Sequence, residues 1–187
     1  MNHADFPLHD RGSAPGAATA FDRAEAAFGM IPNLTRKMAT SPALAQAYLE
    51  LTGLFEGCSL SAQERSVVLL TVSRFHGCDY CMAAHSMTGR MTGLPDAAVD
   101  ALREGRPLLD ERLEALGQFV RAMLEKRGWV DPADTSAFRD AGYSEQHALD
   151  VILGIGLKTL SNYTNHIAGT PVDEAFAHER WTAPVSS

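Results

Sequence analysis

Two cysteines and one histidine near the middle of the chain have the spacing of neighbours on a helix. Cys81 follows Cys78 by three residues, and His85 follows Cys81 by four. Residues three and four apart on an α-helix lie on one face, so these three side chains are expected to lie together. Gly77 places both cysteines near the first turn, where the positive end of the helix dipole lowers the pKa of a thiol. This arrangement favours thiol redox chemistry.

The same residues can supply each step of a redox cycle. His85 lies one helical turn after Cys81 and can accept its proton, directly or through a water. A thiolate can attack an oxidant to give a sulfenic acid, and a thiol three residues away can resolve that acid as a disulfide. An external dithiol then reduces the disulfide. Cys58, the third cysteine, lies at a helix junction and is expected to be inert.

Three other interpretations use the same residues. With His76 added, the set supplies four ligands of the type that zinc prefers, although structural zinc sites usually combine two separated pairs. Haem attachment requires a histidine directly after the second cysteine, and Met82 stands there instead. The cysteines can also be small buried hydrophobes, but the aligned histidine favours chemistry. A non-enzymatic redox sensor or zinc-binding oligomer stays the alternative to a redox enzyme.

Composition and charge exclude several classes of protein. The 187 residues are enough for one well-buried domain, and the formal charge of -7 repels phosphate backbones, so nucleic acid is not an expected partner. No apolar stretch approaches the ~20 residues that cross a bilayer, so no membrane is expected either. Residues 1–20 lack a basic start followed by an apolar core, so a signal peptide is not expected and the predicted location is cytoplasmic. A thiol mechanism requires no cofactor and no metal.

The remaining sequence is expected to form an all-α, single-domain scaffold around these residues. Capping residues, apolar stripes and terminating glycines predict roughly eight helices. Residues 1–19 are predicted to be an N-terminal arm and 20–187 the helical domain, with its cysteine core at 60–92. The last helix is apolar nearly all round, so it should be buried or lie at a subunit interface. The predicted helices cover 21–29, 42–57, 61–75, 78–91, 96–105, 108–127, 131–142 and 145–169.

The segment LSAQERSVVLLTVSRFHGCDYCMAAHS, residues 60–86, resembles the core of the AhpD-like, carboxymuconolactone decarboxylase superfamily. That core is an apolar helix followed by a Cys-x-x-Cys-x-x-x-His helix. Residues 29–34, 91–108 and 157–176 resemble the peroxidase-related branch. The resemblance implies an all-α fold that assembles as a homo-oligomer, a trimer or hexamer, and an alkyl hydroperoxide reductase activity. It also implies a small hydroperoxide as substrate and an external dithiol as reductant.

The resemblance further implies a role for each residue of the motif. Cys81 attacks the peroxide, Cys78 resolves the intermediate, and His85 helps to activate the thiol. The helical spacing independently favours Cys81 as the activated thiol, because it is the cysteine one turn from His85.

The sequence departs from the peroxidase pattern at two positions. Ser66 stands where that pattern has a proton-relay glutamate, and Tyr80 replaces a histidine between the cysteines. Glu64 is near Ser66, but two residues turn a helical side chain by about 200°, so Glu64 is not a simple substitute. His166 lies in a segment similar to the Asn-His-x-x-Gly-Thr-Pro pattern of the branch. It is expected either to reach the cysteine pocket or an adjacent subunit, or to cap its helix.

Overall fold

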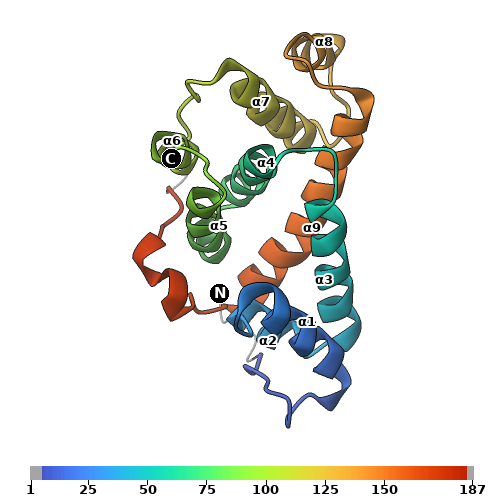
Figure 1. Cartoon of the computed structure of the whole chain (residues 1–187), viewed down its shortest axis with the longest axis vertical. Coiled ribbons are helices and arrows are strands. Elements are labelled where there is room, and N and C mark those ends of the chain that lie inside the picture. The colour runs from blue at the N-terminus through green and yellow to red at the C-terminus, as the bar shows by residue number, and fades with distance from the viewer. Residues whose placement is uncertain (1–5, 185–187) are drawn as a thin grey trace.

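The computed structural model describes residues 6–184, and within that range the chain is all-α, as predicted. Figure 1 shows the helices gathered around α4, with the C-terminal segment running past α5. The described residues form nine α-helices and two short 3-10 helices, η1 and η2. Their bounds are η1 Pro15–Ala17, α1 Ala18–Phe28, α2 Asn33–Met38, α3 Pro42–Glu56, α4 Ala62–Phe75, α5 Asp79–Met91, α6 Asp96–Glu104, α7 Glu111–Glu125, α8 Pro132–Asp140, α9 Glu145–Ala168 and η2 Glu174–Glu179.

The predicted helix starts are explained by their capping side chains. Ser41 accepts a hydrogen bond from the backbone at the start of α3, and Ser61 forms a capping box with Glu64 at the start of α4. Ser144 caps α9 in the same way. Helix α1 ends at Gly29, whose φ of 70° is left-handed and suits glycine. The ends of these helices are therefore determined by residues next to them in the sequence, as expected.

Two differences from the sequence-based expectation lie near the N-terminus. Residues 1–19 were predicted to form an arm without helices. Within the described part of that segment, however, residues from Pro15 onward are helical: η1 begins at Pro15 and α1 at Ala18. Helix α2 was not predicted at all. Its N-cap residue, Pro32, has no side chain that could accept a hydrogen bond from the helix. Instead, the N–H of Asn33, the first residue of α2, donates to the carboxylate of Asp173, at 3.1 Å from each oxygen. A cap supplied by a residue so distant in sequence leaves no local signal.

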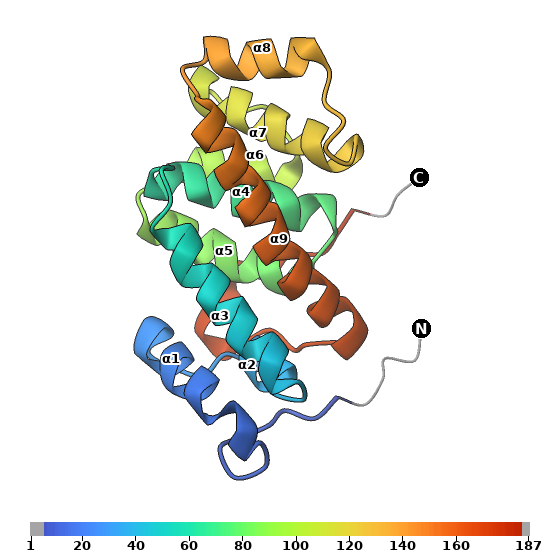
Figure 2. The same ribbon diagram turned by 90° about the vertical axis from the view of Figure 1, so that its right-hand side faces the viewer.

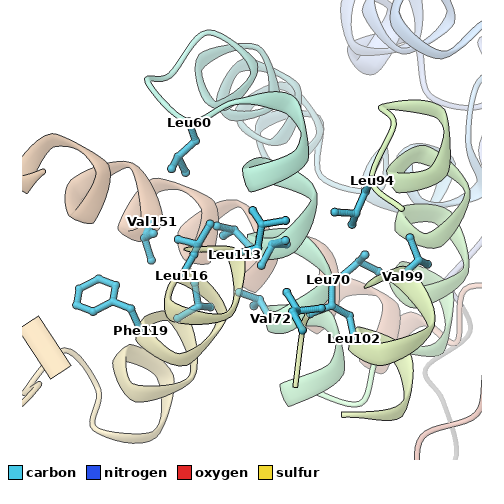
Figure 3. Packing of buried hydrophobic residues seen from close by; sticks show 14 of the residues in the cluster. Leu60, Leu70, Val72, Leu94, Val99, Leu102, Leu113, Leu116, Phe119 and Val151 are labelled. Carbon is cyan, nitrogen blue, oxygen red and sulfur yellow. The ribbon is translucent and has the colours of Figure 1, made fainter. Parts of the chain in front are cut away.

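Helix α4 is the centre of the largest hydrophobic core. It packs against α5, α7 and α9, and Figure 3 shows the core side chains that α4 shares with α6, α7 and α9. The apolar run of α4 is buried nearly all round. This packing fixes the orientation of α4 and therefore the position of the cysteines that follow it. The labelled core residues are Leu60, Leu70, Val72, Leu94, Val99, Leu102, Leu113, Leu116, Phe119 and Val151.

Helix α9 crosses the molecule beside α3, from the α8 end toward the α2 end (Figure 2). One face is buried, as predicted for this apolar helix, and it carries polar side chains toward α5. The opposite face exposes large apolar side chains: Leu149, Ile152, Tyr163 and Ile167. The buried half of the prediction is therefore confirmed, and a subunit interface on the exposed half stays a prediction. Among the described residues, no helix is long and apolar enough to span a membrane.

Candidate active site

The two cysteines lie at the junction between α4 and α5, where the sequence predicts a helix start. Gly77 has a left-handed φ of 66°, which reverses the chain after α4. The N–H of Cys78 donates to the carbonyl of Ser73 at 3.0 Å and closes the turn. Cys78 is the N-cap residue of α5, and Cys81 lies in its first turn. Both thiols are therefore close to the positive end of the helix dipole.

Both sulfur atoms are buried and share one amide donor from α9. Cys78 and Cys81 are each 1% exposed and are not joined by a disulfide. Nδ2 of Asn165 lies 3.2 Å from Sγ of Cys81 and 3.6 Å from Sγ of Cys78. The hydroxyl of Ser161, one helical turn earlier, lies 3.8 Å from Sγ of Cys81. An amide that contacts both sulfurs holds them next to one another, as disulfide formation requires.

The pKa values of the two thiols are shifted in opposite directions. Burial by itself raises the pKa of Cys81, but the hydrogen bond from Cys78, the charge and hydrogen bond of Lys158 and the hydroxyl of Ser161 bring it well below its ordinary value. The hydrogen bond to Cys81, together with burial, raises the pKa of Cys78 far above its ordinary value. Cys81 is consequently the more acidic thiol of the pair, and Cys78 is the less acidic one.

His85 contacts a buried lysine that the sequence-based reasoning did not single out. Nζ of Lys158, on α9, lies 2.8 Å from Nε2 of His85, and the lysine is only 1% exposed. Burial and the neighbouring positive charge hold the pKa of His85 well below its ordinary value, so the imidazole is neutral at pH 7. An ammonium has only donors, so Nε2 accepts this hydrogen bond.

Two cavities meet at His85. The smaller, of about 110 Å³, is bordered by Cys81 and His85 together with mostly apolar and aromatic side chains from α1, α2, α3, α5 and η2. The larger, of about 380 Å³, is bordered by His85, Lys158, Ser66 and Thr92 among others. The aromatic residues around the smaller cavity are Phe28, Tyr48, Tyr80 and Phe176. An apolar cavity with one thiolate at its wall suits a small organic molecule with an electrophilic atom.

The remaining predicted site residues take different positions. The hydroxyl of Ser66 donates to the carbonyl of Ala62 and hydrogen-bonds Thr92, both at 3.0 Å, beside the larger cavity. Glu64 accepts from the N–H of Ser61 and pairs with Arg112, and it borders neither cavity. A relay through Glu64 therefore has no support from its contacts.

His166 is exposed and stacks on Tyr163 with ring centroids 6.5 Å apart. It is the preceding residue, Asn165, that reaches the sulfurs. His76, in the turn before Cys78, is half-buried, and burial lowers its pKa. Among the described residues, no three His, Cys, Asp or Glu side chains are grouped so that they could hold a metal ion. The zinc interpretation of the motif consequently lacks its ligand geometry.

Tyr80 forms one wall of the smaller cavity and is held by a buried network. Its hydroxyl donates to Oδ2 of Asp173 at 2.6 Å and accepts from the N–H of Leu34 at 3.3 Å. Its ring meets Phe176 edge-on at 5.4 Å. The network connects α5, α2 and the segment after α9, and so fixes the shape of the cavity.

Replacing Tyr80 with phenylalanine should lower the free energy of unfolding by about 1.5 kcal/mol, because it leaves the Leu34 N–H without its acceptor and the Asp173 carboxylate without one donor. Urea denaturation measures the change. Tyr163→Phe is the matched control, since Tyr163 is 58% exposed and its change should stay within about 0.5 kcal/mol. Equal losses in the two variants would show that the network contributes nothing.

Comparisons with known proteins agree with this fold. Residues 42–116 match the sequence model of the carboxymuconolactone decarboxylase family. No curated protein matches the sequence. The fold is similar to a peroxidase-related protein with an alkylhydroperoxidase AhpD core from Ralstonia eutropha, with a TM-score of 0.82 and 19% identity over 94% of this chain and 95% of that chain.

Two further solved structures share the fold. A peroxidase-related protein from Silicibacter sp. has a TM-score of 0.78 and 20% identity, and 93% of each chain is covered. The debrominase Bmp8 in complex with 2,3,4-tribromopyrrole has a TM-score of 0.77 and 20% identity over 96% of each chain. At such identities these likenesses establish the fold, and the chemistry has to be argued from the residues of this chain.

Proposed function

We propose that this chain is a thiol-dependent oxidoreductase of the AhpD-like, carboxymuconolactone decarboxylase superfamily, and that it reduces small organic hydroperoxides. The observation that carries the proposal is the position of Cys81. Its thiol has a depressed pKa and borders an apolar cavity, while the protonated thiol of Cys78 lies next to it under the same asparagine. Nucleophile and resolving thiol are thus distinguished by their surroundings.

The proposed reaction proceeds in three steps. The Cys81 thiolate attacks the distal oxygen of the hydroperoxide, the O–O bond breaks, and the alkoxide takes a proton to leave as an alcohol. Cys78 then attacks the sulfur of the Cys81 sulfenic acid, and the hydroxide leaves as water with the Cys78 proton. A dithiol reduces the disulfide and is itself oxidised to a disulfide. The sum is one hydroperoxide and one dithiol converted to alcohol, water and a disulfide.

A second candidate reaction is reductive dehalogenation of a small aromatic compound. The smaller cavity is apolar and bordered by aromatic rings, which suits a flat halogenated ring as well as an alkyl hydroperoxide. The Cys81 thiolate would take the halogen, a proton would replace it on the ring, and Cys78 would displace halide to give the same disulfide. The fold shared with the debrominase Bmp8 makes this reaction worth testing beside the first.

The proposed setting follows from the sequence. We place the protein in the cytoplasm, where an external dithiol is available, and expect a homo-oligomer, a trimer or hexamer. The candidate interface is the exposed apolar face of α9, formed by Leu149, Ile152, Tyr163 and Ile167. The alternative, a non-enzymatic redox sensor, would use the same two thiols without turnover.

The test is to supply the reduced protein with three oxidants and to follow both the protein and the oxidant. Cumene hydroperoxide, hydrogen peroxide and 2,3,4-tribromopyrrole are each added with excess dithiothreitol. We expect cumene hydroperoxide to be consumed over many turnovers and to leave a Cys78–Cys81 disulfide, detected by peptide mass mapping, when dithiothreitol is omitted. Cys58→Ser is the control that removes the third thiol and should behave as wild type.

Release of bromide from the pyrrole, faster than peroxide loss, would instead select dehalogenation. One disulfide per chain without turnover under excess dithiol would support the sensor. A protein that forms no disulfide with any of the three oxidants would refute the proposed thiol chemistry.

A further inference from the structure

We infer that Lys158 is a catalytic residue, whose buried ammonium is the counter-ion of the Cys81 thiolate and the acid that protonates the departing alkoxide. The inference rests on the proposed peroxidase function for its second half, because only a hydroperoxide leaves an alkoxide behind. The first half, the pairing of Lys158 with Cys81, concerns the resting protein alone.

The burial of Lys158 requires a nearby anion. The side chain is 1% exposed, and a buried ammonium without a compensating partner is strongly destabilising. Within the described part of the chain, no carboxylate lies within ion-pairing distance of its Nζ. Lys158 lies one helical turn before Ser161, whose hydroxyl is 3.8 Å from Sγ of Cys81, and its Nζ contacts His85, one turn after Cys81 on α5. Cys81 is therefore the acidic group beside the ammonium, and the lowered pKa of its thiol agrees with this placement. A thiolate–ammonium pair therefore accounts for both buried groups at once.

The contact with His85 changes the role expected for that histidine. Its Nε2 accepts from Nζ of Lys158 at 2.8 Å, so this nitrogen cannot also take a proton from Cys81 while the contact lasts. The imidazole is neutral and holds the lysine in place from the α5 side. His85 consequently acts on Cys81 through Lys158, as a positioning residue, in place of the direct base that the helical spacing suggested.

The larger cavity gives Lys158 a source of protons for each cycle. Lys158, His85 and Ser66 all border this cavity of about 380 Å³, whereas Cys81 borders the smaller one. The hydroxyls of Ser66 and Thr92, joined at 3.0 Å, give water in the cavity polar partners. Because both cavities are bordered by His85, and Lys158 contacts His85, the lysine can take up protons from the larger cavity and lies next to the wall of the smaller cavity, where the alkoxide forms.

The proton balance closes over one cycle. The resting protein holds a Cys81 thiolate, a Cys78 thiol and the Lys158 ammonium. Attack on the hydroperoxide produces an alkoxide, which takes a proton from Lys158 and leaves as the alcohol. Disulfide formation uses the proton of Cys78 to release water. Reduction by a dithiol returns three species: the Cys78 thiol, the Cys81 thiolate, and one proton that restores the ammonium of Lys158.

The acidity of Cys81 depends on every charged or titratable group around it. On α5 and the preceding turn these are Cys78, His85 and His76, and Lys158 is on α9. Tyr48 of α3 is buried near both thiols, and burial holds its pKa too high for ionisation at neutral pH. Glu56 and Arg65 border the larger cavity with opposite charges. Lys158 is the cation among these groups whose charge and hydrogen bond act on Cys81 itself.

The first test is the pH dependence of alkylation of Cys81 by iodoacetamide, followed by peptide mapping in the Cys58→Ser protein. Lys158→Met preserves the length of the side chain and removes the charge. We expect this variant to move the alkylation midpoint of Cys81 to or above the ordinary thiol value of about 8.5 and to slow alkylation at pH 7 at least tenfold. Lys158→Arg, which keeps the charge, should recover most of the rate, and Lys158→Gln serves as a second neutral variant.

Circular dichroism and the urea midpoint establish that each variant is folded. If the pH midpoint for alkylation of Cys81 is unchanged in both folded neutral variants, Lys158 is not paired with Cys81. Because no oxidant is present, this result does not depend on the proposed function. A protein that turns over no hydroperoxide and still shows the shift would refute the peroxidase while preserving the ion pair.

The second test separates the acid from the counter-ion by the leaving group. The two oxidants compared are tert-butyl hydroperoxide, whose leaving group is a basic alkoxide, and peracetic acid, whose leaving group is a weakly basic carboxylate. The rate constant for each oxidant is divided by the ionised fraction of Cys81. Loss of a general acid should slow the alkyl hydroperoxide about 10²-fold in Lys158→Met and leave the peracid within about threefold. Equal slowing of the two oxidants would exclude Lys158 as the proton donor.

Discussion

Replacing Cys81 with serine is expected to abolish oxidation of the protein by hydroperoxides, whereas replacing Cys78 should leave a single oxidation that stops at the sulfenic acid. A serine hydroxyl is not ionised at neutral pH and does not attack a peroxide at a useful rate, so the loss for Cys81→Ser should exceed about 10³-fold. Cys78→Ser retains the Cys81 thiolate and its lysine, and it removes only the resolving thiol. The two cysteines should therefore fail at different steps.

The measurement follows the fate of Cys81 directly. A dimedone adduct detected by mass spectrometry reports the sulfenic acid, and it should accumulate on Cys81 in the Cys78→Ser protein but not in wild type, where the disulfide forms first. The Cys58→Ser protein, which keeps both site thiols, should behave as wild type in the same assay. Wild-type peroxide consumption by both site variants would refute the assignment, and an adduct on Cys78 in the Cys81→Ser protein would reverse the roles.

The cysteine motif and most of the helices could be predicted from the sequence, because their signals are local. The spacing of Cys78, Cys81 and His85 fixes their positions on or beside one helix, and a glycine before them marks the turn. Serine caps and terminal glycines define the ends of α3, α4 and α9 within a few residues. These features depend on neighbours within about four positions in the chain.

The other half of the candidate site comes from α9 and has no local signal. Ser161 and Asn165 reach the thiols, and Lys158 reaches His85, from about eighty residues away. Only packing decides which face of α9 meets α5. One clue was present: a lysine stood inside a helix that was expected to be buried, and lysine is almost never fully buried without a partner. That clue marks the lysine as a residue in need of a partner, but it does not say which residue the partner is. Helix α2 escaped prediction for the same physical reason, because its N-terminus is capped by the distant Asp173.

The direction of α9, and with it the position of Lys158, depends on a close approach at Gly154. A Cβ at Gly154 would lie 2.8 Å from Val68 on α4 and 2.9 Å from the ring of Phe55 on α3, distances that real Cβ atoms essentially never show. Gly156, two residues later in the same helix, is exposed, and a Cβ there would meet nothing within 4 Å. The same substitution at the two positions should therefore change stability in opposite directions.

Gly156→Ala should raise the free energy of unfolding by about 0.5 to 1 kcal/mol, because alanine loses less backbone entropy than glycine in a helix. Gly154→Ala gains the same entropy term but forces α9 away from Val68 and Phe55, and overpacking of this kind should lower the free energy of unfolding by about 2 kcal/mol. Urea denaturation of the two variants measures the difference of about 3 kcal/mol. Gly154→Ala should also weaken the effect of Lys158 on Cys81, seen as a higher midpoint for alkylation, while Gly156→Ala leaves that midpoint unchanged. If both alanines stabilise the protein equally, α9 is not held by this contact, and the placement of Lys158 must depend on the rest of the helix.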